Sequence, residues 1–386
     1  MDQSKPKIIR TATVPLSLDL FCRGLLKFLS KEYEVIALSS PLPELKRLGK
    51  REGVRTISVP IERKIAPFRD LASLMRLIRV FRQEKPQMVH SITPKAGLLS
   101  MMAAKAAHVP VRVHTFTGLI FPYEKGWKHW LLRLTDGITA GCATHVIPEG
   151  EGVKNDLISY GITKKPLRVL GNGNVRGIDL NYYQRTPAVL QKARELRHKF
   201  GIPEEAFVFL YVGRFDRDKG LEELVHAFSK LHQLYPDTHL LLGGAQDEGD
   251  KKLPEEISEM ISGHPCIHTS DDWLKDVRHW YAAADALVHP SYREGFPNVV
   301  IEAGAMGLAS IVTDINGSRE IIIEGQNGTI VPPHDEDALF EEMASFVNDP
   351  DKVAALASNA RAIVSIRYER QYVRQCLTDY YKEILS

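Results

Sequence analysis

The sequence predicts an α/β protein of two domains, each built on a parallel sheet. A chain of 386 residues exceeds the size at which one hydrophobic core keeps growing, so two domains are expected. In both halves, short apolar runs alternate with segments of helical spacing, which is the pattern of β-α-β units. Hydrophobic residues make up 44% of the chain and charged residues 25%, as in globular proteins.

The first domain is expected at residues 1–182. Its apolar runs predict strands at 7–10, 34–38, 55–60, 87–90, 111–113 and 167–170, and residues 136–147 are predicted as a helix followed by a strand. Helical spacing predicts helices at 18–30, 68–83, 98–107 and 153–159. In open parallel sheets, ligands bind at the carboxyl ends of the strands, so the loops 11–17, 90–97 and 115–118 are candidate binding segments.

The second domain is expected at residues 183–366, followed by a final helix at 367–386. Strands are predicted at 207–212, 239–244, 266–269, 286–291, 310–313 and 329–331, and a helix at 221–234. Asp271 or Asp272 is expected to cap the helix that runs through Tyr281.

Charge is distributed unevenly along the chain. Residues 1–172 contain 28 basic and 14 acidic side chains, a net charge of +14, so the remainder of this +2 chain carries −12. A basic first half indicates an anionic partner: nucleic acid, an anionic membrane surface or a phosphorylated acceptor. The helix at 68–83 interleaves arginines with apolar residues and could lie on such a membrane. General patterns favour an ordinary helix that covers the sheet and keeps its arginines in water.

The cysteines indicate the compartment. Cys22, Cys142, Cys266 and Cys376 are far apart and form no CxxC pair, so neither a disulfide framework nor a zinc site is expected. The first ten residues lack an apolar signal core, and no run reaches the ~20 apolar residues of a membrane span. We therefore expect a protein that is cytoplasmic or peripheral to a membrane.

The stretch 291–304 carries the most chemistry. Glu294 and Glu302 flank a Gly-Phe-Pro-Asn turn, and Pro297 suits the first turn of the apolar helix that follows. A helix N-terminus favours a phosphate, and carboxylates beside it can accept hydrogen bonds from sugar hydroxyls. The stretch therefore indicates a nucleotide-sugar site. Taken by itself, it also fits a loop–helix junction with two solvated glutamates.

Two further loops contain anion-binding side chains. Residues 213–220 follow an apolar strand and open a helix, with Arg214 to fork onto phosphate oxygens and Lys219 to supply a point charge. Residues 216–218 read Asp-Arg-Asp and so match the DxD pattern of metal-binding sites. We interpret this match as coincidental, because Arg214 and Lys219 can already neutralise a phosphate. In the first domain, Lys95 would strengthen an anion site at a helix start, and His114 can donate to a phosphate or a sugar hydroxyl, although a lone histidine is more often structural.

Found in this order, the motifs resemble those of retaining glycosyltransferases of family 4. The resemblance rests on Glu294 and Glu302, the loop 213–220, the Gly-Asn-Gly turn at 171–173 and the Pro-Ser pair at 290–291, which leads into the 291–304 stretch. It implies the GT-B fold, in which two Rossmann-like domains face each other across a cleft. It also implies that the final helix crosses back to the first domain. The loop 11–17 departs from the pattern, because many relatives have a Gly-Gly pair there.

The resemblance also implies roles for residues. Arg214 and Lys219 would hold the donor diphosphate, Glu294 would contact the transferred sugar, and Glu302 would contact the ribose. His114 would face the donor sugar as a fourth catalytic residue. The donor site would further include Gly213, Gly295, Phe296, Pro297, Asn298 and Val299, and the acceptor side Ser17, Asp19, Thr93, Lys95 and Thr117.

We therefore expect a retaining, metal-independent transferase without a cofactor. It would move an N-acetylhexosamine or a hexose from an NDP-sugar, with uridine as the expected base, to a polyprenyl-diphosphate-linked or related glycan at an anionic membrane. An NDP-sugar epimerase on the same fold and a catalytically silent subunit of a glycan-assembly complex are the alternatives. A nucleic-acid partner is not expected, because the acidic second half and the lack of a binding motif argue against it.

Overall fold

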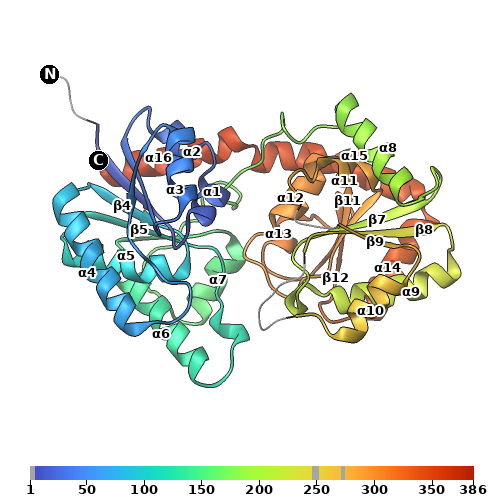
Figure 1. Ribbon diagram of the computed structural model, residues 1–386, viewed down its shortest axis with the longest axis horizontal. Coiled ribbons are helices and arrows are strands. Elements are labelled where there is room, and N and C mark those ends of the chain that lie inside the picture. The colour runs from blue at the N-terminus through green and yellow to red at the C-terminus, as the bar shows by residue number, and fades with distance from the viewer. Residues whose placement is uncertain (1–4, 246–251, 271–273) are drawn as a thin grey trace. The chain divides into compact units, whose positions relative to one another are not determined.

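The computed structural model describes residues 5–245, 252–270 and 274–386 (Figure 1). The chain divides into two compact units: residues up to Gly177 together with Gln371–Ser386 form unit 1, and Ile178–Arg370 form unit 2. The expected helix cap at Asp271 or Asp272 lies outside the described residues.

In the described residues, unit 1 contains a six-stranded parallel sheet in the order β3-β2-β1-β4-β5-β6. Its strands are β1 (Lys7–Thr11), β2 (Glu34–Ser39), β3 (Arg55–Ser58), β4 (Met88–Ser91), β5 (Val111–Phe116) and β6 (His145–Pro148). Its helices are α1 (Pro15–Cys22), α2 (Leu25–Leu29), α3 (Pro43–Glu52), α4 (Pro67–Glu84), α5 (Pro94–Ala106), α6 (Gly126–Cys142), α7 (Glu151–Ser159) and α16 (Arg370–Leu385). This sheet confirms the predicted fold class.

Unit 2 repeats the plan in its described residues, with the sheet order β12-β11-β10-β7-β8-β9. Its strands are β7 (Phe207–Val212), β8 (Thr238–Gly243), β9 (Ile267–Thr269), β10 (Ala286–His289), β11 (Ala309–Thr313) and β12 (Gly328–Val331). Its helices are α8 (Pro187–Lys199), α9 (Leu221–Leu234), α10 (Glu255–Gly263), α11 (Arg278–Ala283), α12 (Asn298–Ala305), α13 (Ser318–Ile321), α14 (Glu336–Asn348) and α15 (Pro350–Tyr368).

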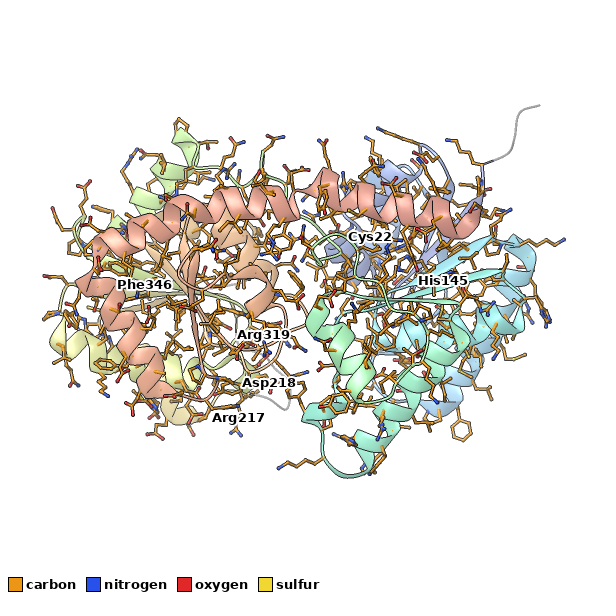
Figure 2. All side chains as sticks on the ribbon, turned by 180° about the vertical axis from the view of Figure 1, so that it is seen from behind. Cys22, His145, Arg217, Asp218, Arg319 and Phe346 are labelled. Atoms are coloured by element: carbon orange, nitrogen blue, oxygen red, sulfur yellow. The ribbon has the colours of Figure 1, made fainter. Side chains whose placement is uncertain are left out.

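Each sheet is buried on both faces, which explains its near-continuous apolar strands. In unit 2, Phe346 of α14 packs in one of the cores beside the sheet (Figure 2). In unit 1, Cys22 belongs to a core that also includes Leu377 and Tyr381 of α16. The guanidinium of Arg10 donates to the hydroxyl of Tyr381 at 2.6 Å, so the end of the chain is bound into the first unit.

Three local expectations were wrong. The helix expected at 18–30 is split into α1 and α2, because Gly24 has a left-handed backbone with φ of +70°. The expected strand at 167–170 forms only a single bridge, between Leu167 and Val146. The apolar face expected on the helix at 68–83 is divided: Phe81 is buried, whereas Leu71 and Met75 are exposed.

Candidate functional site

The loops that follow β7 and β10 meet at one edge of the second sheet. The two strands are parallel neighbours, with Phe209 opposite Ala286, so their carboxyl ends lie side by side. Gly220 makes the close approach possible: its φ is +65°, and a Cβ built on it would sit 2.0 Å from the carbonyl oxygen of Pro290. The sequence predicted each loop as a binding segment, and the sheet order brings the two together.

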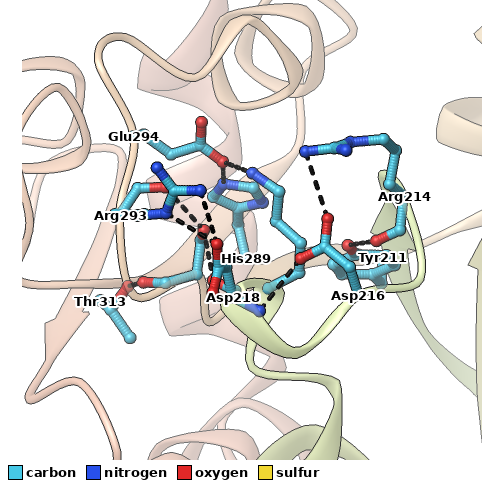
Figure 3. A network of polar contacts seen from close by, with 10 residues as sticks. Tyr211, Arg214, Asp216, Asp218, His289, Arg293, Glu294 and Thr313 are labelled. Carbon is cyan, nitrogen blue, oxygen red and sulfur yellow. Dashed lines mark hydrogen bonds and ion pairs between the residues drawn. The ribbon is translucent and has the colours of Figure 1, made fainter. Parts of the chain in front are cut away.

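An ion pair joins the two loops (Figure 3). The ammonium of Lys219 donates to Oε1 of Glu294, and Nε2 of His289 lies 3.3 Å from the same oxygen. Burial alone would raise the pKa of Glu294. The charge of Lys219 and the imidazole of His289 outweigh burial and hold this pKa well below its usual range. Glu294 is therefore a carboxylate at physiological pH.

The two aspartates of the DxD spelling have different partners. Nη2 of Arg214 lies 3.2 Å from Asp216, whose carboxylate also caps the backbone N–H of Asp218. Asp218 pairs with Arg293 at 2.6 Å. Within the described ranges, no group of three or more His, Cys, Asp or Glu side chains is placed to hold a metal ion.

The helix of the 291–304 stretch starts one residue later than expected. Pro297 is the N-cap of α12 rather than part of its first turn, so Asn298 and Val299 supply the first N–H groups. Gly317 packs closely against the turn at 295–297, since a Cβ on it would sit 2.6 Å from the carbonyl oxygen of Gly295.

Two predicted donor residues on this stretch are buried. Glu302 is 6% exposed, and its Oε2 accepts a hydrogen bond from the hydroxyl of Tyr281 at 3.2 Å. Phe296 packs edge-on against Tyr368 in the core of unit 2. Gly213 precedes Arg214 and donates its N–H to Gly243 at the end of the neighbouring strand β8.

In unit 1, three of the predicted residues line one pocket. Thr93, His114 and Thr117 share it with Asp136 of α6. Nδ1 of His114 lies 2.7 Å from the hydroxyl of Ser91, and burial lowers the pKa of His114 to about 3, so the imidazole is neutral. Burial raises the pKa of Asp136 to about 7. The pocket therefore places a neutral imidazole and a carboxyl that is partly protonated near neutral pH where both can hydrogen-bond a hydroxyl-bearing ligand.

The remaining predicted acceptor residues do not line this pocket. Asp19 is bound by Arg23 at 2.7 Å and by Arg51 at 2.5 Å. Ser17 stands on the same helix, α1. Lys95 does lie at the start of α5, but its ammonium pairs with Asp70 at 2.7 Å, so a carboxylate already matches the charge that was expected to strengthen an anion site.

Three side chains of these sites were missed in the sequence. His289 ends strand β10 and reads as an ordinary strand residue. Arg293 stands inside the central motif, and only its contact with Asp218 reveals a role. Asp136 lies on an amphipathic helix, where a carboxylate normally faces water; its place in the pocket depends on how α6 packs.

Comparison with protein families gives two matches. Residues 192–363 match the family described as "Glycosyl transferases group 1", and residues 25–173 match the "Glycosyl transferase 4-like domain". The described residues contain no helix that is both long and apolar enough to cross a membrane.

Several named relatives match most of the chain. The capsular polysaccharide biosynthesis glycosyltransferase CapM of Staphylococcus aureus is 32% identical over 98% of both chains. The UDP-Gal:alpha-D-GlcNAc-diphosphoundecaprenol alpha-1,3-galactosyltransferase of Escherichia coli is 27% identical over 77% of this chain and 76% of its own. Among solved structures, HepE of Anabaena in complex with UDP and glucose superposes with a TM-score of 0.81 at 19% identity, covering 98% of this chain and 99% of its own. That likeness supports the two-domain GT-B fold.

Proposed function

The chain belongs to the glycosyltransferases of group 1, and from this we propose that it transfers a sugar from a nucleoside diphosphate sugar to a lipid-linked glycan. The observation that carries the donor half is the Lys219–Glu294 pair, which joins two loops beside the start of α12. A cation and a helix N-terminus together suit a diphosphate, and a carboxylate held ionised beside them suits sugar hydroxyls.

The names of relatives support the finer assignment. The galactosyltransferase of E. coli is named for a UDP-sugar and a diphosphoundecaprenol acceptor, and CapM for capsular polysaccharide. HepE has been crystallised with UDP-glucose. We therefore propose uridine as the base, a hexose or an N-acetylhexosamine as the sugar, and a polyprenyl-diphosphate-linked glycan as the acceptor, used at the inner face of an anionic membrane.

The proposed reaction retains the anomeric configuration. The bond between the anomeric carbon and the diphosphate oxygen breaks, the acceptor oxygen bonds to the same face, and its proton passes to the departing diphosphate. Arg214 and Lys219 would stabilise the charge that develops on that group, which is typically the largest catalytic contribution. The site would need no metal, since these cations would already neutralise the diphosphate, and no cofactor.

Glu294 would position the sugar rather than attack it. Oε1 of Glu294 accepts from Lys219 and lies 3.3 Å from Nε2 of His289, and these two partners hold the carboxylate in place. A route through two displacements would need this carboxylate as nucleophile, and trapping of a glycosyl-enzyme at Glu294 would support that route. On the acceptor side, the neutral imidazole of His114 and the pocket around Asp136 would bind hydroxyls of the acceptor or of the donor sugar.

A ligand screen tests the donor assignment. Thermal shift is measured with UDP, GDP, ADP, dTDP and CMP, because a ligand that binds only the folded state raises its stability. Selective stabilisation by UDP is expected. No shift with any nucleotide would contradict the proposal and support the silent subunit. Transfer is then measured with UDP-sugars and a lipid-linked acceptor, and the anomeric configuration of the product tests retention. Release of an altered nucleotide sugar without acceptor would identify an epimerase.

A further inference from the structure

Two helices of unit 1 expose apolar triplets at the same spacing. Phe68, Leu71 and Met75 stand on α4, and Trp127, Trp130 and Leu134 on α6. Positions i, i+3 and i+7 lie on one face of a helix, so each triplet forms a stripe. Phe68 is 91% exposed, and both tryptophans are 65% exposed. We call these six residues the interfacial patch.

Exposed large hydrophobic side chains are concentrated around this patch. Of the 18 large hydrophobic side chains exposed in the described residues, nine lie within 65–75 and 120–134. Single exposed apolar side chains are ordinary on a protein surface, but a cluster of this kind marks a binding surface.

Both stripes lie at the same edge of unit 1. Helices α4, α5 and α6 are neighbours in one layer, since α5 packs against each of the others (Figure 1). Each connects parallel strands, so each begins at the carboxyl edge of the sheet, where both triplets stand. Leu77 and Phe81, on the opposite side of α4, are buried in the core, so the stripe faces away from the sheet.

Basic side chains surround the patch. Residues 62–83 carry six arginines and lysines against two acids, and all six basic side chains are exposed. The two acids, Glu62 and Asp70, are already paired with Arg69 and Lys95. On α6 and the loop before it, Lys125 and Lys128 flank Trp127 and are exposed. An exposed apolar stripe with a basic rim is complementary to an anionic membrane surface.

We propose that the interfacial patch docks unit 1 onto an anionic lipid bilayer. The apolar side chains enter the boundary between headgroups and acyl chains, where tryptophan is favoured, and the arginines and lysines bind the headgroups. The pocket that holds His114 is at the same edge, and Ile120 both lines it and is exposed. Docking would therefore present this pocket to a lipid-linked substrate. The patch would thus be the surface through which the proposed transferase contacts the membrane, and this use of the patch rests on the proposed function.

Vesicle co-sedimentation tests the surface without any substrate. Wild-type chain is expected to bind vesicles of phosphatidylethanolamine and phosphatidylglycerol and to bind phosphatidylcholine vesicles weakly. The triple variant Phe68→Ser/Leu71→Ser/Met75→Ser is expected to lose about tenfold or more in partition coefficient, because apolar area drives insertion. Arg76→Gln/Arg79→Gln should lower binding to anionic vesicles only, and added salt should do the same.

The matched control uses apolar side chains exposed on unit 2. Leu234 and Ile366 are 63% and 75% exposed, so Leu234→Ser/Ile366→Ser removes exposed apolar side chains outside the interfacial patch. This variant should bind vesicles as the wild type does. Equal vesicle binding by the Phe68 triple variant and the wild type would overturn the proposal, as would no binding by the wild type. So would a dimer in lipid-free solution that the triple variant abolishes, because the patch would then bind a second copy.

Insertion has its own readout. Brominated lipids quench tryptophan at the acyl boundary, so quenching is expected in the wild type and should fall strongly in Trp127→Phe/Trp130→Phe, which keeps an apolar surface. Quenching that persists in this variant would overturn insertion at α6. Nucleotide binding by thermal shift is measured on the same variants. It should be unchanged, and this separates failure of the membrane contact from failure of the proposed transferase site.

Discussion

The imidazole of His114 lies directly against the backbone of Gly97: a Cβ built on Gly97 would sit 2.3 Å from Cε1 of the ring. Gly97 is on α5, and His114 is on the neighbouring strand β5. The absence of a side chain at residue 97 therefore allows His114 to reach both Ser91 and the pocket.

Gly97→Ala should displace this imidazole and destabilise the fold. Overpacking a buried site costs about 1–3 kcal/mol in the free energy of unfolding, which urea denaturation measures. Gly141→Ala on α6 is the control, because a Cβ there meets nothing within 4 Å. This control should cause no loss. An unchanged stability in Gly97→Ala would show that the ring can move away freely.

Lys219→Met should weaken the binding of nucleoside diphosphate. The variant removes a cation expected to bind the diphosphate and leaves Glu294 buried without its ion pair. A charged hydrogen bond contributes about 1.5–3 kcal/mol, so a loss of about tenfold to a hundredfold in UDP affinity is expected by calorimetry.

The control for this change is Lys230→Met on α9, the helix that follows the loop of Lys219. Lys230 of α9 pairs with Asp337 at the surface, so its loss should leave UDP affinity as it is. Equal affinity in Lys219→Met and the wild type would remove Lys219 from the proposed site.

Asp136→Asn should stabilise the chain increasingly as pH rises. Burial raises the pKa of Asp136 from 3.8 to about 7, so between these values the native state keeps a proton that the unfolded state has lost. Stability of the wild type therefore falls with rising pH across this window, whereas asparagine cannot ionise.

Urea unfolding at several pH values measures the effect. The advantage of Asp136→Asn is expected to grow by about 1 kcal/mol per pH unit up to about pH 7 and then to level off. The exposed Asp337→Asn serves as the control for loss of a surface carboxylate. A constant difference for Asp136→Asn at all pH values would show that its carboxyl is not perturbed.

Tyr381→Phe should destabilise unit 1. The hydroxyl of Tyr381 contacts both Arg10 and His90 in a buried network, so its removal takes one hydrogen-bond partner from each, at a cost of about 1–3 kcal/mol. Tyr372→Phe on the same helix is the control, because Tyr372 is 41% exposed. Thermal unfolding of both variants checks the difference, and equal melting temperatures would contradict the prediction.

Much of the fold could be predicted because strands buried on both faces are continuous apolar runs, as in Phe207–Val212. A similar pattern at residues 167–170 gave a single bridge, from Leu167 to Val146 of the outermost strand β6, because an apolar run does not by itself fix how many backbone pairs form. On α4, alternation of arginine with apolar residues was visible, but which apolar side chains face water depends on tertiary packing.

The candidate site shows the same limit. Lys219 and Glu294 could be predicted separately, since each lies in a loop that follows an apolar strand. Their contact depends on β7 and β10 being neighbours, although β8 and β9 come between them in the chain. Asp136 could not be identified from spacing, because its pocket is formed by three segments that only the folded unit brings together.

The bond between Arg10 and Tyr381 spans 371 residues of sequence. Unit 2 is continuous in the chain, whereas unit 1 needs residues from before and after it. During synthesis on the ribosome, unit 2 can therefore complete its core while unit 1 still lacks α16. The first unit to emerge is the last to be finished, and until α16 is made the apolar core around Cys22 lacks Leu377 and Tyr381.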